Sequence, residues 1–310
     1  MLDRDGADHG AALGAMVLAA ALVLSLLIVG LRLATGGRPG PPPTPTPAPT
    51  AVPTSTPLPP TPTPTPPPPP TVVPTVPAVA GSRRPIVCLD PGHGGEDLGN
   101  VRVENGEMVL KEKDFTLAVG LALEQRLQAD GFDVVMTRTT DSEANPTNLD
   151  VNGDGTVAAA DGPAHSDELD DLQARVNICN AANADVLVSI HFNGAENVYL
   201  EGYEVWYNDQ RPFSDRSATL ASLVHEELGK QFAAAGYDAN DRGIGIEDHA
   251  VTGPARPGKL VPSNMPGVVV EGLFLSNDDD AQFLASGKAT DAIVNAYESA
   301  IKRYFAEYPV

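Results

Sequence analysis

The chain has 310 residues and carries 41 acidic against 20 basic side chains, which gives a formal charge of −21 at pH 7. Acids and bases balance over residues 1–38, and residues 39–82 carry none, so the negative charge belongs to residues 83–310. A surface of this sign excludes a nucleic-acid-binding protein, because phosphates require clustered lysine and arginine. Acidity alone identifies no partner, since it usually means a soluble, self-repelling surface.

The amino-terminal segment is predicted to meet a membrane. After a flank of residues 1–10, residues 11–34 are apolar, and Ala11 to Leu31 contains no charged residue. At about 1.5 Å per residue this run could cross a hydrocarbon core of about 30 Å. A cleavable signal peptide is the alternative, but its apolar region spans only about 7–15 residues. We therefore predict a transmembrane helix or signal anchor.

Residues 39–82 are expected to be a disordered linker. Proline alternates there with threonine, valine and alanine, a composition that cannot bury a core and favours an extended polyproline II form. At about 3.1 Å per residue, such a spacer reaches on the order of 100 Å. We expect it to hold a single folded domain, residues 83–310, away from the membrane.

The folded domain begins with a short apolar run that leads into a glycine turn carrying a histidine. Ile86 to Leu89 favours a strand, and Asp90-Pro91-Gly92 is expected to end it, because proline cannot donate a ladder hydrogen bond. His93 then lies just past the carboxyl end of the strand, the edge where α/β proteins build their sites.

A helix and a strand are predicted next. Asp114 is expected to cap a helix that runs to about Asp130, with Leu117, Ala118, Leu121 and Gln125 on neighbouring turns. Phe132 to Thr137 has the composition of a strand.

A polar insertion at residues 141–170 follows and contains a candidate calcium loop. Oxygen ligands and a turn-forming glycine at this spacing are typical of calcium loops, although Gly162-Pro163 interrupts any full exit helix. A solvated acidic turn is the alternative. In the calcium interpretation the ligands are Asp150, Asn152, Asp154, the Thr156 carbonyl and Asp161.

Two later strands deliver further polar groups to the same edge. Asp185 to Ile190 ends at His191, and Gly267 to Val270 ends at Glu271. Together with His93 and Glu112, they offer imidazole and carboxylate groups that suit zinc, with one coordination position left for water. Spacing alone leaves the choice among Glu112, Glu104 and Glu107 nearly open.

The remaining periodicities complete an α/β pattern. Leu169, Leu172, Val176 and Cys179 mark one helical face, Tyr203 to Tyr207 a strand, and residues 220–232 a long amphipathic helix, before a last helix around Ile293 to Tyr304. Strands that alternate with long helices predict a mostly parallel twisted sheet with helices on both faces.

Four blocks, in order, resemble the signature of the zinc-dependent N-acetylmuramoyl-L-alanine amidases, which hydrolyse cell-wall peptidoglycan. They are Asp90-Pro-Gly-His-Gly-Gly95, Lys111-Glu-Lys-Asp114, Ser189-Ile-His-Phe-Asn193 and Val269-Val-Glu-Gly-Leu-Phe-Leu-Ser-Asn277. In the last block the glycine follows the glutamate directly, whereas relatives more often have Glu-Leu-Gly-Phe or Glu-Thr-Gly-Phe. The similarity spans roughly Pro85 to Tyr308.

The resemblance implies that His93, Glu112 and His191 bind zinc and that Glu271 is the catalytic glutamate. It also implies cleavage of the amide bond between N-acetylmuramic acid and L-alanine of the stem peptide. The domain must then lie outside the cell membrane, although Arg32 and Arg38 after the span favour the opposite orientation. Two alternatives remain, a non-catalytic wall-binding or activator protein of this fold, and a zinc peptidase of peptide cross-links.

Two smaller predictions concern the surroundings of the site. Asn193, Arg138 and Arg175 are candidates to bind substrate carboxylates or to support the site, with surface ion pairs as the plainer alternative. Cys88 and Cys179 are the only cysteines. In a domain outside the cell they could pair, but both fall in apolar patterns, so we favour unpaired, buried cysteines.

Overall fold

The computed structural model describes residues 83–157, 168–256 and 259–310. The predicted anchor at residues 11–34 and the linker at residues 39–82 lie outside these residues. Within the described part, no helix is both long enough and apolar enough to span a bilayer. Its elements, in chain order, are β1 (Ile86–Pro91), β2 (Val101–Glu104), β3 (Glu107–Lys111), α2 (Glu112–Ala129), β4 (Asp133–Met136), α3 (Glu168–Ala181), β5 (Val186–Asn193), β6 (Tyr203–Tyr207), α4 (Ser214–Ala234), β7 (Asp241–Ile246), β8 (Gly267–Phe274), α5 (Asp278–Ala285) and α6 (Lys288–Glu307).

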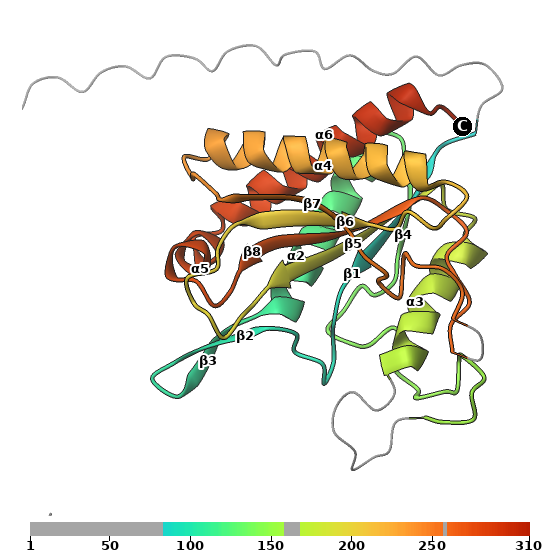
Figure 1. The fold of residues 1–310 in the computed structure, drawn as a ribbon, viewed down its shortest axis with the longest axis horizontal. Coiled ribbons are helices and arrows are strands. Elements are labelled where there is room, and N and C mark those ends of the chain that lie inside the picture. Colours follow the sequence, from blue (N-terminus) through green and yellow to red (C-terminus); the bar gives the residue numbers. More distant parts are fainter. Residues whose placement is uncertain (1–82, 158–167, 257–258) are drawn as a thin grey trace, which may run out of the picture. The chain divides into compact units, whose positions relative to one another are not determined.

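Six strands form one sheet in the order β4-β1-β5-β8-β6-β7 (Figure 1). Neighbouring strands run parallel, except that β6 pairs antiparallel with β8. The mostly parallel α/β sheet expected from the sequence is therefore confirmed. Because β1, β5 and β8 are adjacent and parallel, their carboxyl ends meet at one edge of the sheet.

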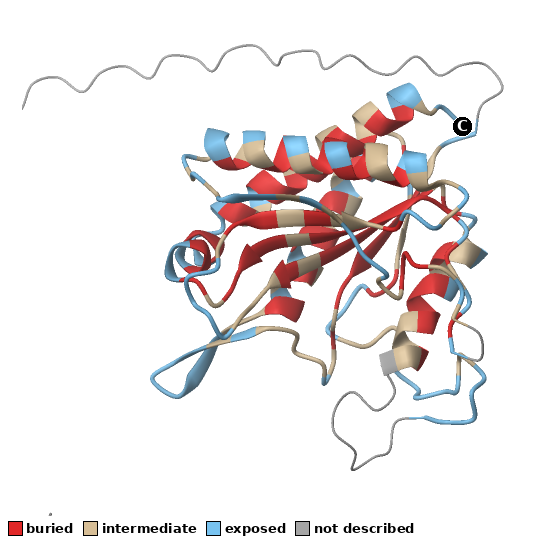
Figure 2. Ribbon diagram, in the orientation of Figure 1, coloured by how far each residue is buried: buried red, intermediate tan, exposed pale blue. Residues whose placement is uncertain are grey.

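Both faces of the sheet are covered, and the two hydrophobic cores that cover them differ in size. Val87 and Leu89 belong to the larger core, under α2, α4 and α6, whereas Cys88 between them belongs to a smaller core with Val176 and Cys179 of α3. This division follows from the alternation of side chains along a strand. Figure 2 shows the central strands buried between these layers and the β2-β3 hairpin exposed.

Helix α2 differs from its prediction in its start, and the face that it buries was not predicted. It begins at Glu112 rather than at Asp114, which lies exposed in its first turn. Val119, Leu123 and Leu127 are fully buried, whereas Leu117 and Leu121 are half-buried. Apolar residues lie on more than one side of this helix, so periodicity alone did not select the side that packs on the sheet.

The β2-β3 hairpin was missed by the sequence analysis, although Asn105-Gly106 is a strong hairpin signal. Both residues have a positive φ, 53° and 85°, as a two-residue type I′ turn requires. The hairpin leads directly from the His93 loop into α2, and so it decides where Glu112 lies. Strand β7 and helix α5 were also not predicted.

The prediction of unpaired cysteines was wrong. Cys88 of β1 and Cys179 of α3 form a disulfide, with their Cα atoms 5.6 Å apart. Both residues are fully buried in the smaller core, so their apolar sequence context was interpreted correctly but did not exclude pairing. A disulfide fits an oxidising environment such as the outside of a cell.

Candidate metal centre

Among the described residues, one group of histidine, cysteine and acidic side chains is placed to hold a metal ion: His93, Glu112 and His191. The Nε2 atom of His93 lies 3.0 Å from Oε1 of Glu112. The Nδ1 atom of His191 lies 3.1 Å from the same oxygen and 3.2 Å from His93 Nε2. Three segments far apart in the sequence thus bring three donor atoms to one point.

The donor set fits a small divalent cation. Ligand atoms at about 2.0–2.2 Å from a tetrahedral ion lie about 3.3–3.6 Å from one another. The observed separations of 3.0–3.2 Å differ from this by only a few tenths of an ångström. Two imidazoles and one carboxylate are ligands that zinc accepts, and three protein ligands leave the fourth position open.

The sheet and the glycine turn explain why the two rings meet. His191 lies in β5 beyond Ile190, and Ile190 is paired with Pro91 at the end of β1. A Cβ atom on Gly92 would come within 2.1 Å of the His191 ring. The absence of a side chain at Gly92 is therefore what allows His191 to lie over the turn that carries His93.

An outer layer of hydrogen bonds orients the donors. The Nδ1 atom of His93 lies 2.7 Å from an oxygen of Asp97, which leaves Nε2 directed at the centre. Glu112 is almost fully buried, and its Oε2 accepts hydrogen bonds from the backbone and side-chain nitrogens of Asn100 at 2.8 and 2.9 Å. Its Oε1 accepts from the backbone N–H of Phe192.

The pKa values of His93 and Glu112 show that the cluster favours a positive charge at its centre. Burial opposes the charged form of His93, but hydrogen bonds to Asp97 and Glu112 outweigh burial and raise the pKa to about 10. Burial likewise opposes the charged form of Glu112, yet hydrogen bonds to both imidazoles hold its pKa well below the usual range. Without a metal ion the cluster therefore holds a proton, which an incoming cation would displace.

Glu271 is placed beside the cluster. It lies in β8 and is paired in register with His191 of the adjacent parallel strand. Burial raises the pKa of the Glu271 carboxyl to about 7. Gly272 fits closely against the ring of Phe192, where a Cβ atom would approach to 2.9 Å. The unusual position of this glycine is thus compatible with Glu271 at the predicted edge.

The two arginines that were candidates for substrate binding are buried, with 4% of Arg138 and 3% of Arg175 exposed. Arg138 donates to the backbone oxygens of Pro91 and Gly92, and Arg175 donates to those of Pro91 and His93. Both side chains therefore contact the backbone of the loop that carries His93 and are not surface ion pairs, and a role in binding substrate stays a prediction.

Asn193 lies at the end of β5, within hydrogen-bonding distance of Glu204 on β6. The Nδ2 atom of Asn193 donates to Glu204 at 2.9 Å, and Glu204 is the residue paired with Glu271 across the antiparallel strands. Asn193 is half-buried. Its side chain therefore borders the same edge of the sheet as Glu271.

Four of the five predicted calcium ligands lie in the described part of the chain, whereas Asp161 lies outside it. Asp150 accepts hydrogen bonds from the backbone nitrogens of Gly153 and Gly155, at 2.8 and 3.0 Å. Asn152 and Asp154 each accept from a backbone nitrogen two residues later. The loop is curled and exposed, and calcium binding by it stays a prediction.

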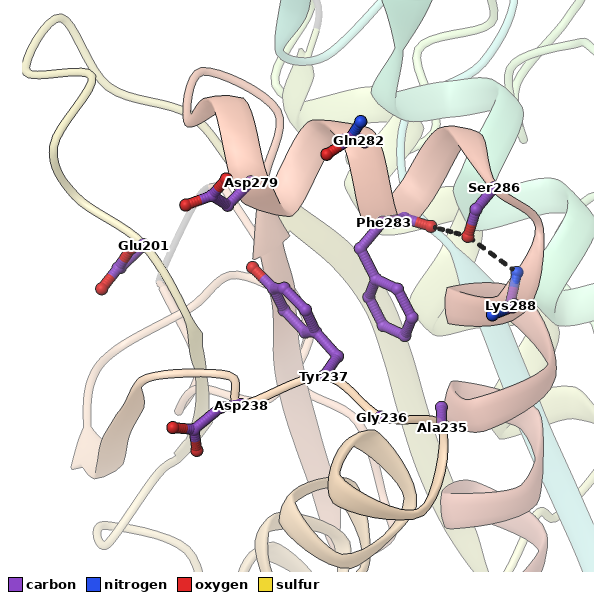
Figure 3. Close-up of a pocket in the computed structure, with 10 residues that line it drawn as sticks. All are labelled: Glu201, Ala235, Gly236, Tyr237, Asp238, Asp279, Gln282, Phe283, Ser286 and Lys288. Atoms are coloured by element: carbon purple, nitrogen blue, oxygen red, sulfur yellow. Dashed lines mark hydrogen bonds between the residues drawn. The ribbon is translucent and has the colours of Figure 1, made fainter.

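A cavity of about 490 Å³ lies between the loop before β6, the turn after α4, and α5 (Figure 3). Tyr237 stacks on Phe283 beside it, with ring centroids 4.3 Å apart. Glu201, Asp238 and Asp279 line the cavity together with Lys288. None of the predicted ligands or catalytic residues lines it.

The residues that orient the ligands were not predicted from the sequence. Asp97 follows His93 by four residues in the same glycine-rich loop, and a histidine so close to an aspartate was a usable signal. Asn100 contacts Glu112 and also donates to the backbone oxygen of Phe192. Its role depends on the fold of the hairpin, so nothing in the local sequence indicated it.

Comparison with known proteins points to one family. The family model described as N-acetylmuramoyl-L-alanine amidase matches residues 87–303. The germination-specific N-acetylmuramoyl-L-alanine amidase of Bacillus subtilis (strain 168) is 29% identical over 223 residues, which cover 72% of this chain and 80% of the relative.

Solved structures give the same result. The CwlD amidase of Clostridioides difficile, determined in complex with the GerS lipoprotein, aligns with a TM-score of 0.57 at 25% identity over 72% of this chain and 100% of that one. The amidase AmiC2 of Nostoc punctiforme aligns with a TM-score of 0.53 at 26% identity over 73% and 99%. The chain therefore belongs to the N-acetylmuramoyl-L-alanine amidase family.

Proposed function

We propose that this chain is a zinc-dependent amidase that hydrolyses the bond between N-acetylmuramic acid and L-alanine in peptidoglycan. The observation that carries the proposal is the convergence of three donor atoms within 3.0–3.2 Å, with Glu271 paired beside His191. Membership of the amidase family supports the choice of substrate.

In this proposal His93, Glu112 and His191 hold the zinc ion. Bound zinc would lower the pKa of a water molecule and polarise the carbonyl of the scissile amide. Asp97 keeps the proton of His93 on Nδ1 and so leaves Nε2 free as a ligand. Asn100 fixes the carboxylate of Glu112 through Oε2.

Glu271 acts as the general base and then as the general acid. Its pKa of about 7 lies near neutral pH, where a carboxylate exchanges protons most effectively. It would take a proton from the attacking water and pass it to the leaving nitrogen of L-alanine. The positive charge of a bound cation lowers this pKa, so we expect the acidic limb of the pH profile to lie below about 7.

The test is release of stem peptides from purified cell wall. We expect wild type to produce a new amino terminus on L-alanine, and Glu271→Gln to lower the rate by about 10²–10⁴-fold. Glu226→Gln, an exposed change on α4, is the matched control and should leave the rate unchanged. Chelation should abolish the activity and added zinc should restore it.

The products also separate the two alternatives. A non-catalytic wall-binding protein would sediment with the wall and release no peptide. A zinc peptidase of cross-links would create new amines on residues other than the first L-alanine. Either result would overturn the proposed reaction.

We further propose that residues 11–34 anchor the chain in the cell membrane and that residues 39–82 extend the amidase domain outward to the wall. The length and hydropathy of the first segment and the proline content of the second support this arrangement. Membrane fractionation with protease added outside tests it. Full-length protein that remains in the soluble fraction, or that is protected from the protease, would contradict it.

A further inference from the structure

The loop that carries His93 has an unusual backbone. His93 is not a glycine, yet its φ is 60°, in the left-handed region that side chains disfavour. It follows the last residue of β1 by only two positions and belongs to no strand itself. A metal ligand in this conformation needs support from outside the loop to keep its direction.

That support comes from two buried arginines that bind three consecutive backbone oxygens. Arg175 donates to the oxygens of Pro91 and His93, both at 2.8 Å. Arg138 donates to the oxygens of Pro91 at 2.8 Å and Gly92 at 2.9 Å. Every carbonyl from the end of β1 to the ligand is thereby fixed by a guanidinium group.

The position of Arg175 is itself fixed by charge. It is 3% exposed and forms ion pairs with Asp90 at 2.8 Å and Asp171 at 2.7 Å. Burial opposes its charged form, but these two carboxylates outweigh burial and raise its pKa. All three of its nitrogens are in use, in a planar fork that a lysine ammonium cannot reproduce.

The disulfide joins the two elements that meet at Arg175. Cys88 lies two residues before Asp90 on β1, and Cys179 lies one helical turn after Arg175 on α3. Both cysteines belong to the smaller of the two cores. The disulfide therefore links β1 to α3 close to the ion pair between Arg175 and Asp90.

We propose that Arg175 is a positioning residue for the metal ligand His93 and that the Cys88–Cys179 disulfide keeps it in place. When α3 moves away from β1, the carbonyls of Pro91 and His93 lose a donor, and His93 leaves its left-handed conformation. The disulfide makes such openings rarer, and so it slows release of the metal ion. The inference rests on the zinc site of the proposed function.

The first test is the zinc affinity of Arg175→Lys in the full-length protein, measured by competition with a chelator. We expect the affinity to fall by about 10–100-fold, as for other outer-layer partners of metal ligands. Cobalt substitution supplies a spectroscopic measure, because a displaced imidazole changes the visible absorption. Wild-type affinity and an unchanged cobalt spectrum in this variant would overturn the role of Arg175.

The second test is the rate at which zinc passes to excess chelator from the double variant Cys88→Ala/Cys179→Ala. We expect release at least about tenfold faster than from wild type, because local openings are more frequent. Leu228→Ala is the control. It removes a fully buried side chain from the larger core and should lower the melting temperature without changing the release rate.

The outcomes are distinct. Equal release rates in wild type and the double variant would show that the disulfide only stabilises the fold. If the double variant does not fold, Arg175→Lys still decides the positioning role. A wild-type protein that takes up no zinc contradicts the proposed function, whereas zinc-loaded wild type with unaltered variants contradicts this inference alone.

Discussion

The two imidazoles of the site reach one point by different means. His191 lies in β5, which is paired with β1 on one side and with β8 on the other, so ladder hydrogen bonds hold its backbone. His93 lies beyond the end of β1, where Arg175 donates to its carbonyl and Arg138 donates to that of Gly92. The first kind of support needs only strand-forming residues, whereas the second needs particular side chains from distant segments.

The largest effects should come from removing the ligands, and here the two histidines should behave alike. We expect His93→Ala and His191→Ala each to weaken zinc binding by more than about 100-fold, beyond the range for an outer-layer partner. Equilibrium dialysis with metal analysis measures this loss. His225→Ala is the control, because that histidine pairs with Asp241 away from the cluster. A histidine variant that retained wild-type affinity would remove its residue from the site.

The next effect concerns stability and tests the side-chain support of the loop that carries His93. Asp90 is buried and accepts hydrogen bonds from Arg175, Thr137 and Ser189. Asp90→Asn leaves a buried guanidinium short of one charge partner, so we expect a loss of about 3 kcal/mol in the free energy of unfolding. Urea unfolding at pH 7 measures it, with the exposed Asp114→Asn as control. A loss below about 0.5 kcal/mol would show that the ion pair of Asp90 with Arg175 does not stabilise the fold.

The same carboxyl gives a pH dependence of known sign. Burial opposes the charged form of Asp90, but Arg175 and three hydrogen bonds outweigh burial and lower its pKa. Its contribution is therefore fully present above the unfolded value of about 3.9 and is lost as the pH falls through the lower folded value. The difference in stability between wild type and Asp90→Asn should shrink below about pH 4, and a constant difference would contradict this origin.

A smaller effect is expected for the partner that orients the His93 ring. Asp97→Asn weakens the contact with Nδ1, and we expect zinc affinity to fall by about 10-fold, at the lower end of the range for such partners. The chain offers a matched control in Asp241→Asn, since His225 and Asp241 are also 2.7 Å apart. Equal affinities in the two variants would mean that Asp97 does not orient the ring.

The contrast between the two supports also explains what the sequence could predict. Strand β5 and the buried face of α6 follow from apolar runs and periodicity, which are local properties. His191 and Glu271 were placed at one edge of the sheet because each follows a predicted strand, whereas the order of the strands was not predicted. The supporting roles of Arg138 and Arg175, the pairing of Cys88 with Cys179, and Asn100 beside Glu112 depend on segments that meet only after folding. No local sequence pattern predicts those contacts.

The smallest effect is expected in residues 150–157, a segment held by side chains without any strand ladder. Asp150 and Asp154 already accept backbone hydrogen bonds, so without calcium we expect Asp154→Ala to change the melting temperature by no more than about 2 °C. With calcium, wild type should melt at a higher temperature and Asp154→Ala should not, because a cation that binds only the folded state stabilises that state. Isothermal titration gives the heat of binding directly. If wild type shows neither heat of binding nor a shift in melting temperature, the loop does not bind calcium. Its acidic side chains then only accept hydrogen bonds from the backbone of the loop.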